Sequence, residues 1–209
     1  MTDEHGRLGT VERDGDTVRL RYVRHLAHSP TTVWRALTES AGLRHWFPAD
    51  IVGERAAGAE VQLPFWPEGA QQSMEMLDEA GVDTTGMDPD EVLPGLIRAF
   101  DPPTLFELVW GNSEGEADVL RFELEPVDGG TRLVFTTWPG EPGPLGHAGT
   151  AAGWHACLDE LESMLRGAAG SAGAAGVAGP AGASGAAGSP DRDAAQQLRE
   201  EYAARLAEA

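Results

Sequence analysis

Alternation of apolar and polar residues predicts a chain rich in β-strands. In residues 17–26 alternate positions are apolar, as at Leu20 and Tyr22, and only Arg24 interrupts the series. A period of two is typical of a strand that buries one face. The same alternation, with glycine-rich turns between the runs, predicts further strands over residues 60–65, 96–100, 106–110, 117–125 and 132–135.

Helical patterns stand before and after these strands. Ser29-Pro30 supplies an N-cap and a first helical residue. A second short helix follows and ends at Pro48. The longest helix is predicted over residues 149–166, with Gly167 as its C-cap. Its apolar stripe consists of Trp154, Leu158, Leu161 and Leu165.

The order of these elements predicts an α+β fold. It is a curved antiparallel β-sheet wrapped around a long C-terminal helix, with two short helices after the first strand. A sheet curved in this way tends to leave a cavity between itself and the helix. We expect the domain to span residues 17–166, with a flexible N-terminus at 1–16 and an acidic insertion at 67–92.

Composition changes sharply after this domain. Within residues 167–190 glycine stands at every third position, and no residue is charged. The period is that of collagen, but two prolines are too few for a triple helix, so we interpret the run as a Gly/Ala-rich linker. Residues 191–209 are predicted to form a helical tail that docks weakly on the domain or on a partner, or frays. Its narrow apolar stripe consists of Leu198, Tyr202 and Leu206.

Charge excludes several classes of function. The 209 residues include 34 acidic and 15 basic ones, all of the latter arginine, for a net charge of −19. Without lysine there is neither a Walker-type phosphate loop nor Schiff-base chemistry. The acidic balance argues against nucleic acid or anionic lipid as a partner. The single cysteine excludes a disulfide framework, and the absence of a long apolar run argues against a membrane span. We expect a cytoplasmic protein.

Candidate catalytic and metal-binding motifs are weak. Residues 111–115 match the G-x-S-x-G nucleophile elbow around Ser113, but a strand is predicted to follow where the elbow requires a helix. Two histidines near the long helix, His147 and His155, are too far apart to share a metal, and His25 and His28 point in different directions from a strand end. The acids of the insertion lack EF-hand spacing and are interpreted as a solvated loop. We therefore predict no catalytic residue, no metal site and no cofactor.

Four stretches together resemble a known superfamily. They are residues 33–38 (VWRALT) leading to 43–47 (LRHWF), 101–110 (DPPTLFELVW), 124–133 (LEPVDGGTRL) and 153–161 (GWHACLDEL). In this order they resemble the SRPBCC, or START-like, helix-grip superfamily. Within it they are similar to the branch named for the C-terminal domain of the heat-shock-protein-90 ATPase activator. The resemblance implies a pocket for a small apolar or amphipathic molecule, and it covers neither the insertion nor the tail.

The predicted function is binding of a small hydrophobic or amphipathic molecule in a cavity between sheet and long helix. Two alternatives stay open: a co-chaperone-like module that binds a protein with a basic surface, and a cyclase-like or hydrolase-like enzyme using the same cavity. We expect a monomer or homodimer. Thr137 is a further polar group that could orient a ligand. The predicted ligand-binding residues are Trp46, Phe65, Arg98, Trp110, Phe122, Phe135, Trp154, His155 and Leu158.

Overall fold

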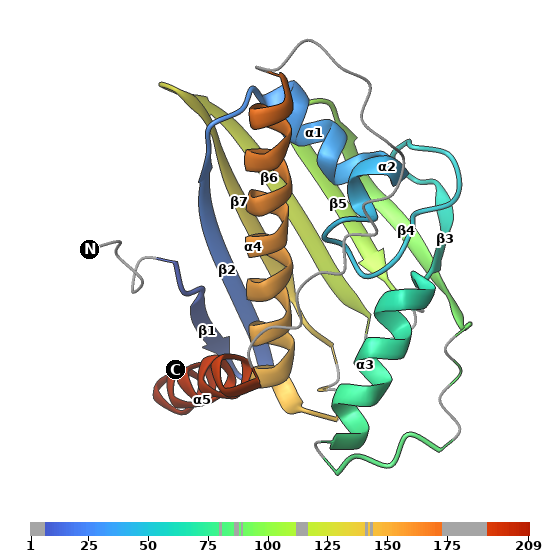
Figure 1. The fold of residues 1–209 in the computed structure, drawn as a ribbon, viewed down its shortest axis with the longest axis vertical. Coiled ribbons are helices and arrows are strands. Elements are labelled where there is room, and N and C mark those ends of the chain that lie inside the picture. Colours follow the sequence, from blue (N-terminus) through green and yellow to red (C-terminus); the bar gives the residue numbers. More distant parts are fainter. Residues whose placement is uncertain are drawn as a thin grey trace.

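The computed structural model describes residues 7–79, 81–85, 88, 90–111, 117–140, 142, 144–172 and 192–209. These residues form one seven-stranded antiparallel sheet in the order β1-β2-β7-β6-β5-β4-β3 (Figure 1). The strands are β1 (Thr10–Asp14), β2 (Thr17–Leu26), β3 (Glu60–Pro64), β4 (Val92–Asp101), β5 (Leu105–Trp110), β6 (Asp118–Val127) and β7 (Gly130–Trp138). The helices are α1 (Pro30–Thr38), α2 (Ser40–Leu43), α3 (Pro67–Glu79), α4 (Gly146–Ala172) and α5 (Arg192–Glu208).

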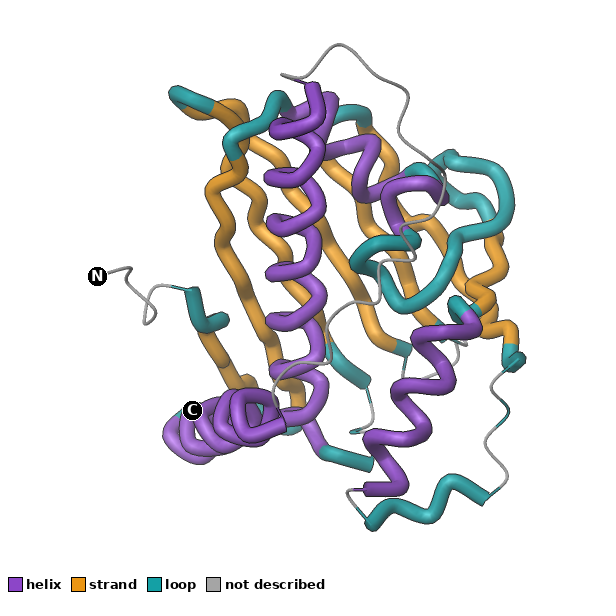
Figure 2. The backbone as a smooth tube through the Cα atoms, in the orientation of Figure 1, coloured by secondary structure: helices purple, strands orange, loops and turns teal. Residues whose placement is uncertain are grey.

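The long helix α4 runs along one face of the sheet, in front of β2 and β7 (Figure 1). The short helices α1 and α2 lie beside it on the same face, and α5 crosses the lower end of α4 next to β1 (Figure 2). We call the face toward α4 the inner face. This arrangement confirms the predicted α+β fold with a long helix across an antiparallel sheet.

One row of aromatic side chains crosses the inner face. Paired strands place Tyr22, Phe135, Phe122, Phe106 and Phe100 opposite one another in turn. The ring centroids of Phe122 and Phe135 lie 4.6 Å apart, and those of Tyr22 and Phe135 lie 5.7 Å apart, both pairs stacked. Such pairs add about 0.5–1.5 kcal/mol each beyond their buried area. The row also favours a single register, since a slip by one residue would turn the rings of a strand outward.

Several boundaries differ from the sequence-based expectation. Residues 10–14, assigned to a flexible N-terminus, form β1 and pair with β2. The second short helix ends at Leu43, and the residues that follow it form turns. The long helix continues through Gly167 to Ala172, so Gly167 is not its C-cap. The extension contains alanines, which have the highest helix propensity of any residue.

The insertion and the linker are described only in part. Residues 67–79 form α3, and β4 already begins at Val92, four residues before the predicted strand. Asp88 of the insertion lies outside helix and strand. Most of the linker and all of residues 112–116, which include Ser113, lie outside the described residues.

Candidate functional site

A second layer of rings lies between the aromatic row and α4. Trp154 of α4 packs edge-on against Phe135, with the centroids 5.1 Å apart. Phe47, from the turn after α2, contacts both Trp154 at 5.8 Å and Trp110 at 5.3 Å. Phe65 contacts Trp110 from the end of β3 at 5.8 Å. Trp154 is 8% exposed, whereas Trp110 and Phe65 are half-buried, so the rings become more exposed toward β3 and β5.

Next to the aromatic row, one hydroxyl interrupts a row of aliphatic side chains. Thr137 of β7 is 0% exposed, and its Oγ1 has no hydrogen-bond partner among the described residues. Leaving a buried hydroxyl unpaired costs about 1–3 kcal/mol. Its neighbours across the paired strands are Leu20, Leu120, Leu108 and Ile97, all 0% exposed.

Thr131 on the same strand is a buried threonine whose hydroxyl has a hydrogen-bond partner. It is also 0% exposed, but its Oγ1 donates to the carbonyl of His28 at 2.7 Å. Nε1 of Trp66, between β3 and α3, is another buried donor without a hydrogen-bond partner in the part of the chain that the structure describes.

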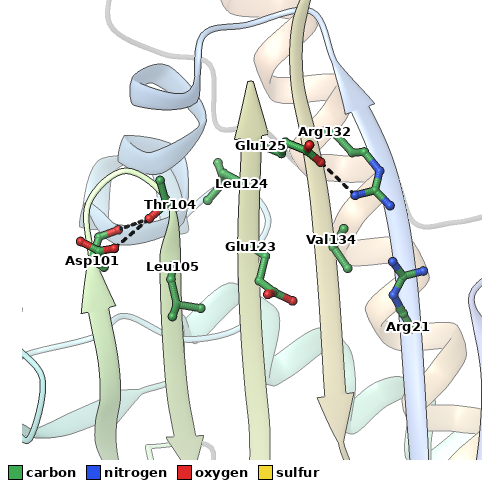
Figure 3. Close-up of a pocket in the computed structure, with 9 residues that line it drawn as sticks. All are labelled: Arg21, Asp101, Thr104, Leu105, Glu123, Leu124, Glu125, Arg132 and Val134. Carbon is green, nitrogen blue, oxygen red and sulfur yellow. Dashed lines mark hydrogen bonds and ion pairs between the residues drawn. The ribbon is translucent and has the colours of Figure 1, made fainter. Parts of the chain in front are cut away.

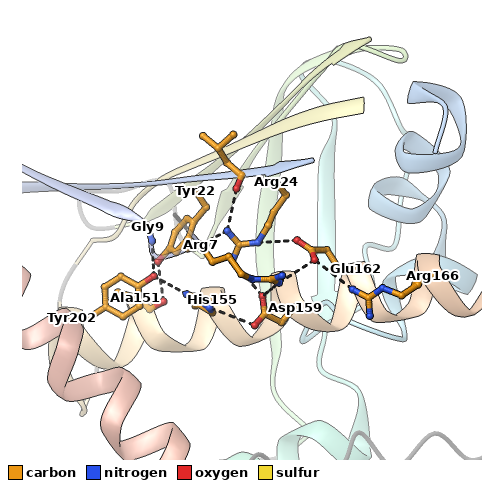
Figure 4. Close-up of polar contacts among 11 residues, drawn as sticks. Arg7, Gly9, Tyr22, Arg24, Ala151, His155, Asp159, Glu162, Arg166 and Tyr202 are labelled. Atoms are coloured by element: carbon orange, nitrogen blue, oxygen red, sulfur yellow. Dashed lines mark hydrogen bonds and ion pairs between the residues drawn. The ribbon is translucent and has the colours of Figure 1, made fainter. Parts of the chain in front are cut away.

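A polar network fills the space between β2 and the middle of α4 (Figure 4). Its centre is Arg24, which is 3% exposed. The Arg24 guanidinium lies 3.3 Å from Oδ1 of Asp159 and 3.2 Å from Oε1 of Glu162, and it donates to the carbonyl of Arg7 at 2.8 Å. The Arg7 guanidinium reaches the same two carboxylates at 2.8 and 3.0 Å. Two arginines therefore share two carboxylates of α4.

The network continues to the tail helix through Tyr202, which is 0% exposed. Its hydroxyl accepts the Gly9 N–H at 2.8 Å and lies 3.0 Å from Nδ1 of His155. Nε2 of His155 lies 3.4 Å from Oδ2 of Asp159. Both ring nitrogens of His155 therefore have a partner, the Tyr202 hydroxyl at Nδ1 and the Asp159 carboxylate at Nε2.

Electrostatics of this network favour a charged Asp159. Burial raises its pKa, but hydrogen bonds from His155 and Arg7 outweigh burial and hold this pKa well below its ordinary value. Burial raises the pKa of Tyr202. All these groups already have partners within the protein, so the network is best understood as the structural connection between α4, the N-terminal segment and α5.

Comparison with known families gives one match over most of the chain. The family described as "Activator of Hsp90 ATPase homolog 1-like protein" matches residues 27–166. The chain belongs to this family. The resemblance predicted from the motifs is thereby confirmed. Arg7, Arg24 and Tyr202 of the polar network lie outside the matched residues of this activator-like family.

Solved structures share the fold of this chain. A conserved protein of unknown function from Enterococcus faecalis is 20% identical, with a TM-score of 0.61, over 96% of this chain and 91% of its own. CalU16 from Micromonospora echinospora is 15% identical, with a TM-score of 0.59, over 96% of both chains. These identities show the fold alone. A search of curated proteins gives no match. No helix in the described residues is long and apolar enough to cross a membrane.

The structure brings most of the predicted site residues together. Leu158 is buried in the core. Ring contacts, some through Phe47, join all the predicted aromatic residues into one cluster: Trp46, Phe65, Trp110, Phe122, Phe135 and Trp154. Two polar residues lie elsewhere. Arg98 is exposed at a bulge of β4, where the register shifts between Ile97 and Ala99. His155 belongs to the polar network and contacts Tyr202.

Sequence reasoning missed Arg24 and Asp118. Arg24 was treated as an interruption of a strand, yet its position on the buried face required charged partners inside the protein. Asp118 begins β6 two residues before Leu120, so the alternation of that strand already placed it on the inner face. Tyr202 was predicted only as part of the stripe of a tail that docks weakly on the domain or on a partner, or frays. The structure buries Tyr202 in the core.

A depression also lies on the opposite, outer face of the sheet (Figure 3). Its lining is largely charged, and Arg132 pairs there with Glu125 at 3.3 Å. Thr104 donates to Asp101 at its edge. This surface differs in chemistry from the apolar site that the sequence predicts, and the ring cluster remains the better candidate.

Proposed function

We propose that the protein binds a small, mostly apolar molecule with one hydrogen-bonding group, between the inner face of the sheet and α4. The observation that carries the proposal is the buried, unpaired hydroxyl of Thr137 beside a cluster of aromatic rings. Membership of the activator-like family supports a fold of this binding type. The half-buried rings of Trp110 and Phe65 would form the apolar wall nearest the surface.

A bound molecule would stabilise the proposed site in two ways. The apolar body would gain burial against the rings, at roughly 25 cal/mol per Å² of apolar surface. Its polar group would complete the hydrogen bond that Thr137 lacks, and so remove a buried-polar penalty of about 1–3 kcal/mol. A ligand without a polar group would gain only the first of these.

Decanol is a suitable test ligand because it has one hydroxyl and an apolar chain. The wild type is expected to bind the neutral fluorescent probe N-phenyl-1-naphthylamine and to release it when decanol is added. Thr137→Val should weaken decanol binding about five- to ten-fold, since it removes one hydrogen-bonding partner. The same variant should be more stable by about 1 kcal/mol, because it removes an unpaired buried hydroxyl at nearly constant volume.

Thr131→Val is the matched control, on the same strand and equally buried. It removes a hydroxyl that has a partner, so it should lose about 1–2 kcal/mol of stability and keep the affinity for decanol. A wild type that binds neither the probe nor decanol would refute the proposed function. The candidate function to test would then be a co-chaperone-like module, in which the acidic protein binds a basic protein surface.

A further inference from the structure

A carboxylate faces the inner side of the sheet at one end of the ring cluster. Asp118 alternates with Leu120 and Phe122 of β6, which are both buried on the inner face. Its cross-strand partner is Trp110, so the carboxylate and the indole share one side of the sheet. Oδ1 of Asp118 accepts the Gly140 N–H at 2.7 Å. A carboxylate can accept about four hydrogen bonds, so this contact leaves capacity for others.

Asp118 is also a near neighbour of the unpaired hydroxyl. Thr137 pairs with Leu120, two residues along β6 from Asp118, and diagonal neighbours of this kind on one face are about 7–8 Å apart. His147, in the first turn of α4, contacts the carbonyl of Gly140 at 3.3 Å and closes this end of the site. Burial raises the pKa of Asp118, while the Gly140 N–H and His147 act in the opposite direction.

We infer that this end of the site selects ligands that carry a protonated amine on an apolar body. The inference rests on the proposed function and specifies its ligand class. The Asp118 carboxylate pairs with the ammonium, the Thr137 oxygen accepts one of its N–H groups, and the Trp110 ring offers a cation–π contact.

Other polar groups fit this end of the site less well. A carboxylate ligand would lie against Asp118 and be repelled by it. An alcohol can hydrogen-bond to Thr137 but gains no charge pairing. The net charge of −19 attracts cations to the protein over a longer range. The three groups at this end are thus a carboxylate, a hydroxyl oxygen and an aromatic ring, which together recognise an ammonium in proteins.

Three ligands of equal chain length separate the possibilities: decylamine, decanol and decanoate, each titrated against the bound N-phenyl-1-naphthylamine at pH 7. We expect decylamine to bind about ten-fold more tightly than decanol, in line with a charge-assisted hydrogen bond, and decanoate to bind most weakly. Asp118→Asn should abolish the preference for the amine and leave decanol binding unchanged. Its amide oxygen can still accept the Gly140 N–H, so the variant keeps that structural contact.

Asp128→Asn is the matched control, because it makes the same charge change at an exposed hairpin between β6 and β7. It should keep the full preference for decylamine. Equal binding of decylamine and decanol by the wild type, or a preference that survives Asp118→Asn, would overturn the inference and leave the proposed function standing. Failure of all three ligands to displace the probe would overturn both. Thermal unfolding of each variant separates loss of binding from loss of folding.

Discussion

Replacing Tyr202 by phenylalanine removes a single hydroxyl from a fully buried position. That hydroxyl accepts the Gly9 N–H at 2.8 Å and lies 3.0 Å from Nδ1 of His155. The ring itself stays, so the packing against α4 is retained. Each buried group left without a partner costs about 1–3 kcal/mol. We expect Tyr202→Phe to destabilise the protein by about 2 kcal/mol.

The topology sets an upper limit on this loss. Because α4 ends at Ala172 and α5 begins only at Arg192, the tail helix is expected to be able to leave its site without unfolding the sheet. No change within α5 can therefore cost more than the free energy with which α5 docks. Tyr202→Ala and removal of residues 192–209 should lower the free energy of unfolding by the same amount, and both should exceed the loss from Tyr202→Phe.

Urea unfolding followed by tryptophan fluorescence measures these losses. All six tryptophans precede the tail, so the signal reports the domain and not α5 itself. Hydrogen exchange at the Gly9 amide gives a local readout, because its N–H should lose protection in each variant. A truncated chain as stable as the full one, with unchanged protection at Gly9, would refute the reasoning. The tail would then be the weakly docked or frayed helix that the sequence predicts.

Two further predictions concern the charged part of the polar network. Arg24→Met should lower the free energy of unfolding by about 3 kcal/mol, because Glu162 then keeps fewer partners in a mostly buried place; an unchanged urea midpoint would contradict this. The pKa of Asp159 lies well below its ordinary value in the folded state, so the stability it contributes is present above about pH 4 and is lost as pH falls further. Asp159→Asn should therefore show a flatter loss of stability between about pH 4 and pH 2 than the wild type, measured by thermal unfolding at each pH.

Patterns of local period were enough to predict the sheet and the aromatic cluster. Phe122 and Phe135 belong to neighbouring strands, β6 and β7, in which apolar and polar residues alternate. This period of two puts both side chains on the buried face, and strand pairing then stacks their rings. The side of the sheet to which a residue points was harder to predict where the alternation is interrupted. The bulge at Arg98 shifts the register of β4 by one residue and leaves that side chain exposed, away from the predicted site.

Contacts between distant parts of the chain could not be predicted in the same way. Gly9 and Tyr202 are 193 residues apart, and nothing in their local sequence requires them to meet. A tail helix with a narrow apolar stripe is compatible with docking, exchange or fraying. What decides between these outcomes is the complementary site on α4 and β2, which exists only after the domain has folded. Arg24 was the sequence signal for that site, because a charge on a buried face needs partners from elsewhere.

Two adjacent residues of α4 contact different parts of the molecule. Trp154 points toward Phe135 and the ring cluster, while His155 points toward Tyr202. One turn before His155, the carbonyl of Ala151 accepts a hydrogen bond from the Tyr22 hydroxyl at 2.8 Å, which ties the same part of α4 to β2. These contacts hold the helix in a fixed position against the sheet, so neighbouring interactions of α4 with β2 and α5 set the wall that Trp154 contributes to the proposed site. A ligand then meets a surface that is already formed, and its binding energy is not spent on ordering the helix. In this arrangement the polar network and α5 hold the wall of the proposed site in place through contacts made within the protein.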